Sequence, residues 1–177
     1  MRYSNGGITI SGGEPLMQPD FVKELLTRCK DENIHTVVDT SGYMKLDYVK
    51  DLINSTDLVL LDIKSYNDNV CTKLTGVSNK NTLELANYLS QINKPTWIRY
   101  VLVPGITDDM KDIEELAKFL SSMNNIEKVQ ILPFHKMGEY KWKELGFKYK
   151  LENVQPPSDE IIAETNKVFD KYGIKTE

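Results

Sequence analysis

The chain has 177 residues, of which 40% are hydrophobic and 27% charged, and a net charge of -4; this is the composition of one ordinary globular domain. The acidic balance disfavours nucleic acid as a partner, because phosphate binding needs a concentrated cationic surface. No apolar run approaches the roughly 20 residues that span a bilayer, and the first six residues lack a signal-peptide core, so we expect a cytoplasmic protein with no membrane partner.

Short β-branched runs alternate with longer amphipathic segments along the whole chain. In chain order, strands are predicted at residues 7–11, 35–40, 58–63, 96–103 and 128–132. Helices are predicted between and after them, at residues 19–32, 46–54, 82–92, 109–123 and 159–172. This alternation predicts an α/β fold in which about five parallel strands form a sheet or barrel with flanking helices.

Two cysteines, Cys29 and Cys71, are too few and too far apart for a disulfide framework or a Cys-x-x-Cys metal site. We expect each to be a buried small hydrophobe, with Cys29 on one helical stripe with Phe21 and Leu25.

Residues 138–157 form the longest segment without periodicity, which is typical of a lid or binding loop. Its interleaved lysines and aromatic residues favour a protein-docking surface over a nucleic-acid site.

Polar side chains recur on one face of the predicted strands. With a period of two, Asp62 and Lys64 share a face with Leu58 and Leu60. The same parity groups other polar residues, namely His35 with Asp39, Thr9 with Ser11, and Trp97 with Arg99, while His135 follows the last strand. Most of these groups lie near carboxyl ends of strands, where βα-barrel enzymes build their active sites.

Several of these residues also have a purely structural interpretation. Asp39 and Gly42 are compatible with a simple turn, and Asp62 with Lys64 is compatible with a plain ion pair. His135 alone is more typical of a structural residue. Arg99 lies inside an apolar strand, where an unpaired guanidinium costs roughly several kcal/mol, so it requires an anionic partner or ligand.

Six segments, taken together, resemble one known family. They are Gly6–Pro15 with its Gly-Gly-Glu, Val38–Gly42, Leu60–Lys64, Trp97–Gly105, Leu132–His135 and Lys141–Gly146. In this order, and over essentially the whole chain, the set is similar to the pyruvate formate-lyase activating enzymes of the radical S-adenosylmethionine (SAM) superfamily.

The resemblance implies a partial (β/α) barrel of six units. Residues 1–177 would be a single radical SAM core fragment that supplies the second to sixth strands and lacks the first strand–helix unit. In the family, the loop after the first strand carries Cys-x-x-x-Cys-x-x-Cys, which holds a four-iron four-sulfur (4Fe-4S) cluster, and no such triplet occurs here. We therefore expect this chain alone to bind no cluster and to be inactive, as a truncated protein or one begun at an internal methionine.

The resemblance also implies where the methionine part of S-adenosylmethionine would bind. Gly12, Gly13 and Glu14 would meet its amino group through carbonyl and carboxylate oxygens. A possible monovalent cation beside the methionine carboxylate would be held by hard oxygen ligands, from Asp39, Thr40, Asp62 and the backbone of Leu60.

For the nucleoside part, the resemblance assigns Lys64 and His135 to positions near the ribose and adenine, and Arg99 to the same cavity. No acid, base or nucleophile of the protein is implied, because in this chemistry the protein orients the cofactor.

In the family's reaction, reductive cleavage of S-adenosylmethionine gives methionine and a 5′-deoxyadenosyl radical, which generates a glycyl radical on a partner enzyme such as pyruvate formate-lyase. The complete enzyme would need a reductant such as flavodoxin or ferredoxin. Two alternatives stay open: a non-catalytic module that binds S-adenosylmethionine or the partner, and a Schiff-base barrel lyase that uses Lys64.

Overall fold

The centre of the molecule is a parallel sheet. The computed structural model describes residues 6–177. Of the first six residues, for which the sequence predicted no signal-peptide core, only the last is therefore among the described residues. The strands lie in the order in which they occur in the chain, as β1 Gly7–Ile10, β2 His35–Thr40, β3 Leu58–Asp62, β4 Thr96–Leu102 and β5 Ile126–Pro133. The prediction of an α/β fold with about five parallel strands and flanking helices is confirmed.

Helices connect successive strands, and two more follow the last strand. They are η1 Pro15–Met17 (a 3₁₀ turn), α1 Pro19–Asp31, α2 Leu46–Asn54, α3 Asp68–Thr75, α4 Lys80–Gln91, α5 Met110–Ser121, α6 Glu139–Glu144 and α7 Asp159–Lys171. The sequence predicted the five longer ones within two residues at each end and missed η1, α3 and α6. Residues 138–157 are thus not wholly irregular, because α6 lies within them.

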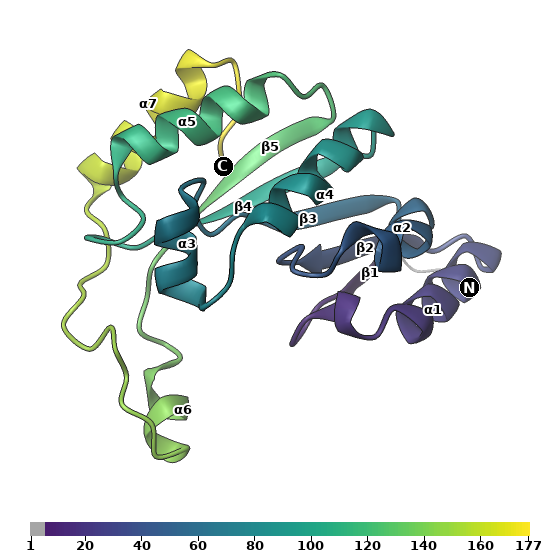
Figure 1. The fold of residues 1–177 in the computed structure, drawn as a ribbon, viewed down its shortest axis with the longest axis horizontal. Coiled ribbons are helices and arrows are strands. Elements are labelled where there is room, and N and C mark those ends of the chain that lie inside the picture. Colours follow the sequence, from purple (N-terminus) through teal and green to yellow (C-terminus); the bar gives the residue numbers. More distant parts are fainter. Residues whose placement is uncertain (1–5) are drawn as a thin grey trace.

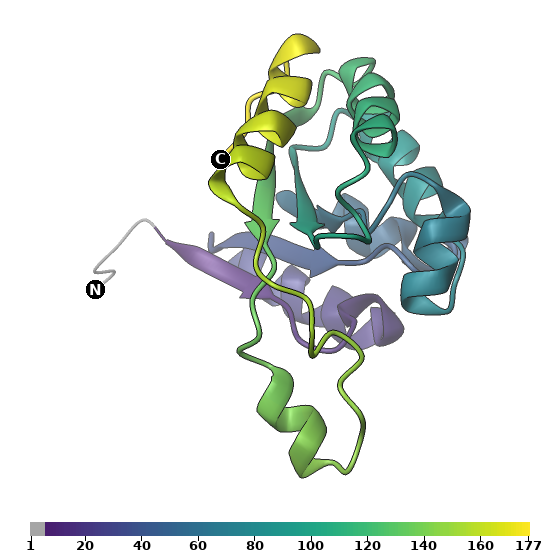
Figure 2. The same cartoon turned by 90° about the vertical axis from the view of Figure 1, so that its left-hand side faces the viewer.

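The sheet is covered on one face only. Helices α1, α2, α4, α5 and α7 pack outside the curved strands (Figures 1 and 2) and contribute to one buried core with β2 to β5. On β3, Val59 and Leu61 are buried, as is Ile63 just after the strand, whereas Leu60 and Asp62 on the opposite face are partly exposed. The predicted parity is therefore correct, and it leaves a concave face that the described helices do not cover.

Both cysteines are buried and free, as predicted. The predicted stripe on α1 was wrong, however, because Cys29 is buried with Val22 and Leu26 while Phe21 is 65% exposed. The face of α1 that packs on the sheet is therefore the one with Val22, Leu26 and Cys29, which is rotated about the helix axis from the predicted face. Among the described residues, no helix combines the length and the apolar character needed to cross a bilayer.

Candidate functional site

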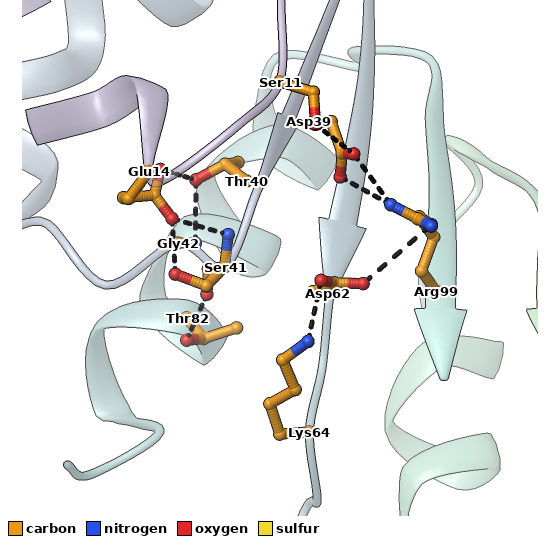
Figure 3. A network of polar contacts seen from close by, with 10 residues as sticks. All are labelled: Ser11, Glu14, Asp39, Thr40, Ser41, Gly42, Asp62, Lys64, Thr82 and Arg99. Atoms are coloured by element: carbon orange, nitrogen blue, oxygen red, sulfur yellow. Dashed lines mark hydrogen bonds and ion pairs between the residues drawn. The ribbon is translucent and has the colours of Figure 1, made fainter. Parts of the chain in front are cut away.

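Four charged side chains, three from neighbouring strands and one from the loop after β3, meet on the concave face (Figure 3). Nη1 of Arg99 donates to both carboxylate oxygens of Asp39, at 2.8 and 2.7 Å. Nε of Arg99 lies 4.0 Å from Oδ1 of Asp62, and Nζ of Lys64 donates to Oδ2 of the same carboxylate at 2.7 Å. Asp39, Asp62, Lys64 and Arg99 were all predicted site residues, and the structure brings them together.

Strand register explains why these side chains meet. Asp62 on β3 is the direct neighbour of Arg99 on β4, and Asp39 on β2 is the neighbour of Leu60 on β3. Arg99 reaches back across Leu60 to Asp39, which the length of its side chain permits. The anionic partner that the sequence required for Arg99 is therefore Asp39, and Ser11 of the preceding loop also donates to that carboxylate at 2.9 Å.

The four groups are half-buried, so they attract one another more strongly than surface charges yet remain within reach of a ligand. Side-chain exposure runs from 16% for Asp39 and 20% for Asp62 to 32% for Lys64. Oδ1 of Asp62 is itself buried and has no hydrogen-bond partner among the described residues. A buried carboxylate oxygen normally accepts a hydrogen bond. This oxygen is therefore the acceptor of the site at which a ligand or cation could supply the missing partner.

Glu14 lies beside this group but is fully engaged by the protein. Its Oε1 accepts from Leu16 N at 3.1 Å and from Thr40 Oγ1 at 2.5 Å. Its Oε2 accepts from the backbone and side chain of Ser41, at 2.9 and 2.5 Å. These four donors fill the roughly four acceptor sites of a carboxylate, so Glu14 ties the loop after β1 to the end of β2 (Figure 3).

Three of the predicted residues, Thr40, Gly12 and Gly13, contribute no side chain to the group of four charged residues. Thr40 lies on the opposite face of β2 from Asp39, and its hydroxyl turns to Glu14 instead of joining the Asp39 and Asp62 carboxylates. Gly12 and Gly13 have φ angles of +92° and +56°, and a Cβ atom added to either would meet nothing within 4 Å. Glycine is needed there for left-handed backbone rather than for close packing, and the loop keeps its backbone open.

The loop that carries Lys64 is fixed by a set of contacts that the sequence did not reveal. Asp112 of α5 accepts from Ser65 Oγ and from Asn67 N, both at 2.6 Å. Asn79, at the start of α4, donates to the carbonyl oxygens of Ser65 and Tyr66 at 3.0 and 2.7 Å. Ser65 is fully buried. Contacts from α4 and α5 therefore hold the segment after β3 in place, and they fix the backbone position from which the Lys64 side chain extends.

His135 does not join the four charged residues. It follows β5 at the carboxyl end of the sheet, is exposed, and its Nδ1 accepts only a local bond from Met137 N at 3.4 Å. The Schiff-base alternative gains no support either, because an imine forms from the neutral amine and the Asp62 carboxylate that accepts from Lys64 favours its charged ammonium form.

A small cavity of about 270 Å³ opens behind Lys64, lined among others by Glu14, Ser41 and Cys71. Burial raises the pKa of the Cys71 thiol, which favours the protonated form over a metal-binding thiolate. Among residues 6–177, no group of three or more His, Cys, Asp or Glu side chains is placed to hold a metal ion. The described residues therefore do not fit a three-cysteine iron–sulfur site.

Comparisons with known proteins agree on one superfamily. The family model of the radical SAM superfamily matches residues 2–120. The pyruvate formate-lyase 1-activating enzyme of Escherichia coli K12 is 43% identical over 177 residues, covering 99% of this chain and 72% of that enzyme. The pyruvate formate-lyase-activating enzyme of Staphylococcus epidermidis is 46% identical over 167 residues, covering 91% of this chain and 66% of the relative.

Solved structures agree with the sequence comparison. A crystal structure of a domain of pyruvate-formate lyase-activating enzyme from Bacteroides vulgatus superposes with a TM-score of 0.82 at 29% identity, covering 97% of this chain and 98% of that one. A radical SAM methyltransferase from Sphaerobacter thermophilus has a TM-score of 0.74 at 20% identity and covers 97% and 50% of the two chains, which is a likeness of fold alone.

Proposed function

The chain belongs to the radical SAM superfamily and, within it, to the pyruvate formate-lyase-activating enzymes, and from this membership we propose that it is the S-adenosylmethionine-binding core of an enzyme that makes a glycyl radical on pyruvate formate-lyase. The superfamily implies S-adenosylmethionine and a 4Fe-4S cluster as cofactors. When bound, the reduced cluster would supply the electron that cleaves the sulfonium into methionine and a 5′-deoxyadenosyl radical, and this radical would take a hydrogen atom from a glycine of the partner.

One observation carries this proposal: the chain of ion pairs Asp39–Arg99–Asp62–Lys64 on the open face, in which Oδ1 of Asp62 has no hydrogen-bond partner among the described residues. S-adenosylmethionine bears an ammonium, a sulfonium and a carboxylate, together with ribose hydroxyls. A half-buried set with both signs of charge provides complementary partners for each of these groups.

We assign the individual groups as follows. The ammonium is accepted by backbone carbonyls of Gly12 and Gly13, whose loop Glu14 holds in place through Thr40 and Ser41. Oδ1 of Asp62, which lacks a hydrogen-bond partner in the described part of the chain, would join Asp39 and the Leu60 carbonyl in holding a monovalent cation beside the methionine carboxylate, and Thr40 supports this set only indirectly. Lys64 donates to the ribose, His135 lies toward the adenine, and Arg99 lines the same cavity and bridges the two carboxylates.

The iron–sulfur cluster has no fitting ligands among the described residues, so none of these assignments depends on it. We propose that residues 1–177 form one radical SAM core unit and that this chain alone does not cleave S-adenosylmethionine. The complete reaction also needs a one-electron donor, for which a flavodoxin or ferredoxin in the cytoplasm is our proposal. The test is anaerobic reconstitution of the 177-residue chain with iron and sulfide. Absorption of a 4Fe-4S cluster together with production of 5′-deoxyadenosine would refute the proposal that this chain alone is inactive.

Binding of S-adenosylmethionine to the same chain tests the site directly. We expect calorimetry to detect binding, and Asp62→Asn or Lys64→Met to weaken it about tenfold, as for the loss of one charged contact of roughly 1.4 kcal/mol. Lys167→Met, at an exposed position on α7, is the matched control and should bind like the parent. Equal affinity in all four proteins would rule out the assigned site.

A further inference from the structure

The segment of residues 136–151, here called the arm, exposes large apolar side chains. It extends away from the sheet and carries α6 (Figures 1 and 2), which has no buried residue. The exposed members are Met137 at 73%, Tyr140 at 56%, Trp142 at 43%, Leu145 at 70% and Phe147 at 61%. Contiguous apolar exposure on this scale is typical of an interaction site.

A cavity lies between the arm and the body of the molecule. It has a volume of about 580 Å³, and Leu74 of α3, Ile106, Trp142 and Tyr149 are among its lining residues. Trp142 is fixed by ring contacts to Phe147 at 6.3 Å and to Tyr149 at 6.0 Å. The space is within the range of roughly 300–1,000 Å³ typical of ligand pockets, so it can take one or two large apolar side chains.

The rim of this cavity is positively charged. Lys73 and Lys150 line it, and neither they nor Lys148 has an ion-pair partner among the described residues. Residues 136–150 contain five lysines and two glutamates, although the whole chain has a net charge of -4. An apolar cavity with an unpaired cationic rim is complementary to a segment that carries carboxylates around an apolar anchor.

We propose that the arm and α3 form a docking cleft for the protein substrate, into which an acidic surface segment inserts a large apolar side chain. The identity of this partner as pyruvate formate-lyase rests on the proposed function. A single-stranded nucleic acid is disfavoured, because base stacking needs free ring faces. Here Trp142 packs against two other rings, and Val70, Leu74 and Ile106 give the cavity aliphatic walls.

The test measures the affinity of purified pyruvate formate-lyase for the full chain and its variants by titration calorimetry. Lys73→Glu combined with Lys150→Glu should weaken binding about tenfold or more, and Trp142→Ala should do the same, since aromatic anchors dominate such interfaces. Lys167→Glu on α7, at the opposite end of the molecule from α6 (Figure 1), is the matched control and should bind like the parent. Unchanged urea midpoints would confirm that the charge variants fold.

The outcomes separate this proposal from the S-adenosylmethionine site. Parent-like affinity in the double charge reversal, or no binding of pyruvate formate-lyase by the parent, overturns the docking cleft even if S-adenosylmethionine binds. Arm-dependent docking without S-adenosylmethionine binding supports the cleft and contradicts the proposed site instead. Tight binding of oligothymidylate that is lost in the same arm variants, while pyruvate formate-lyase binding is not, would assign the cleft to nucleic acid and overturn the proposal.

Discussion

Arg99 of β4 contacts carboxylates near the ends of β2 and β3, and its pairing with Asp39 is closer than its contact with Asp62. We predict that a double-mutant cycle with Asp39→Asn and Arg99→Met gives a coupling free energy of about 1–2 kcal/mol in urea unfolding, because both groups are half-buried and the contact is forked.

The matched control is the exposed pair Lys23 and Asp51, which are also 2.8 Å apart. Its cycle should show much weaker coupling, since water and salt screen exposed charges. Equal coupling in the two cycles would contradict the view that burial on the concave face strengthens the site.

Tyr100 gives a prediction for the pH dependence of stability. Its side chain is fully buried and donates to the Thr107 carbonyl at 2.6 Å, and burial raises its pKa above the ordinary value. The folded protein therefore keeps this proton where the unfolded chain loses it. The resulting stability is complete below the unfolded pKa of about 10 and is lost as pH rises above it.

Tyr100→Phe should cost about 1 kcal/mol at neutral pH through the lost hydrogen bond. Above pH 10 or so, where the unfolded tyrosine ionises, the free energy of unfolding of the parent should fall faster than that of the variant. Tyr48→Phe, at a 67% exposed position, should leave the alkaline slope unchanged. Parallel slopes for the parent and Tyr100→Phe would show that burial of this hydroxyl is not what sets the slope.

At the scale of elements, the turn between β2 and α2 depends on Gly42. Its φ is +66°, and a Cβ there would lie 3.1 Å from Leu61 Cδ1 and 3.1 Å from the backbone of Thr82. Gly42→Ala therefore adds overpacking against α4 to the strain of left-handed backbone, and we predict a loss of about 2–4 kcal/mol in thermal or urea unfolding.

Gly76→Ala separates the two effects. Gly76 ends α3 with φ of +83°, but nothing lies within 4 Å of its Cβ position. This control should lose only the conformational part, about 1 kcal/mol. Similar losses in the two variants would show that crowding at Gly42 is unimportant.

The elements that the sequence predicted are those with a long apolar period. Helix α5 buries Ile113, Leu116 and Leu120 and was found within two residues at each end. Helix α3 has eight residues with only Cys71 buried, and α6 buries nothing. Short helices of this kind are held by caps and loop contacts, such as the Asn67 side chain that caps α3, so hydrophobic periodicity carries no signal for them.

The candidate site was predictable to the extent that it follows strand parity. Alternation placed Asp39, Asp62 and Arg99 on one face, and parallel register then brings them together. Contacts between distant segments were not predictable, and the clamp of Asp112 on Ser65 spans 47 positions in the chain. The turn of Thr40 toward Glu14 was missed for a different reason, because the family motif assigns the residue a role without its side-chain direction.

At the scale of the whole molecule, one-sided covering of the sheet separates stability from function. Apolar side chains of β2 to β5 face the helices, while the open face keeps the charged residues and Trp97. Substitutions on the covered side should thus change mainly the free energy of unfolding, whereas those on the open side should change ligand affinity in addition to any loss of the Asp39–Arg99 ion pair.

The C-terminal residues complete the edge of the sheet beside β5. Val129 N donates to the Lys175 carbonyl at 2.9 Å, Ile131 N donates to that of Glu177 at 3.0 Å, and Glu177 N donates to that of Val129 at 3.1 Å.

We predict that deletion of residues 175–177 costs about 3 kcal/mol in urea unfolding, at roughly 1 kcal/mol per hydrogen bond. The bare edge of β5 should also promote concentration-dependent association in sedimentation velocity, because unpaired strand edges recruit other strands. Glu177→Gln removes only the ion pair with Lys128 and should sediment like the parent and be nearly as stable. If it behaves like the deletion, charge rather than strand pairing holds this edge.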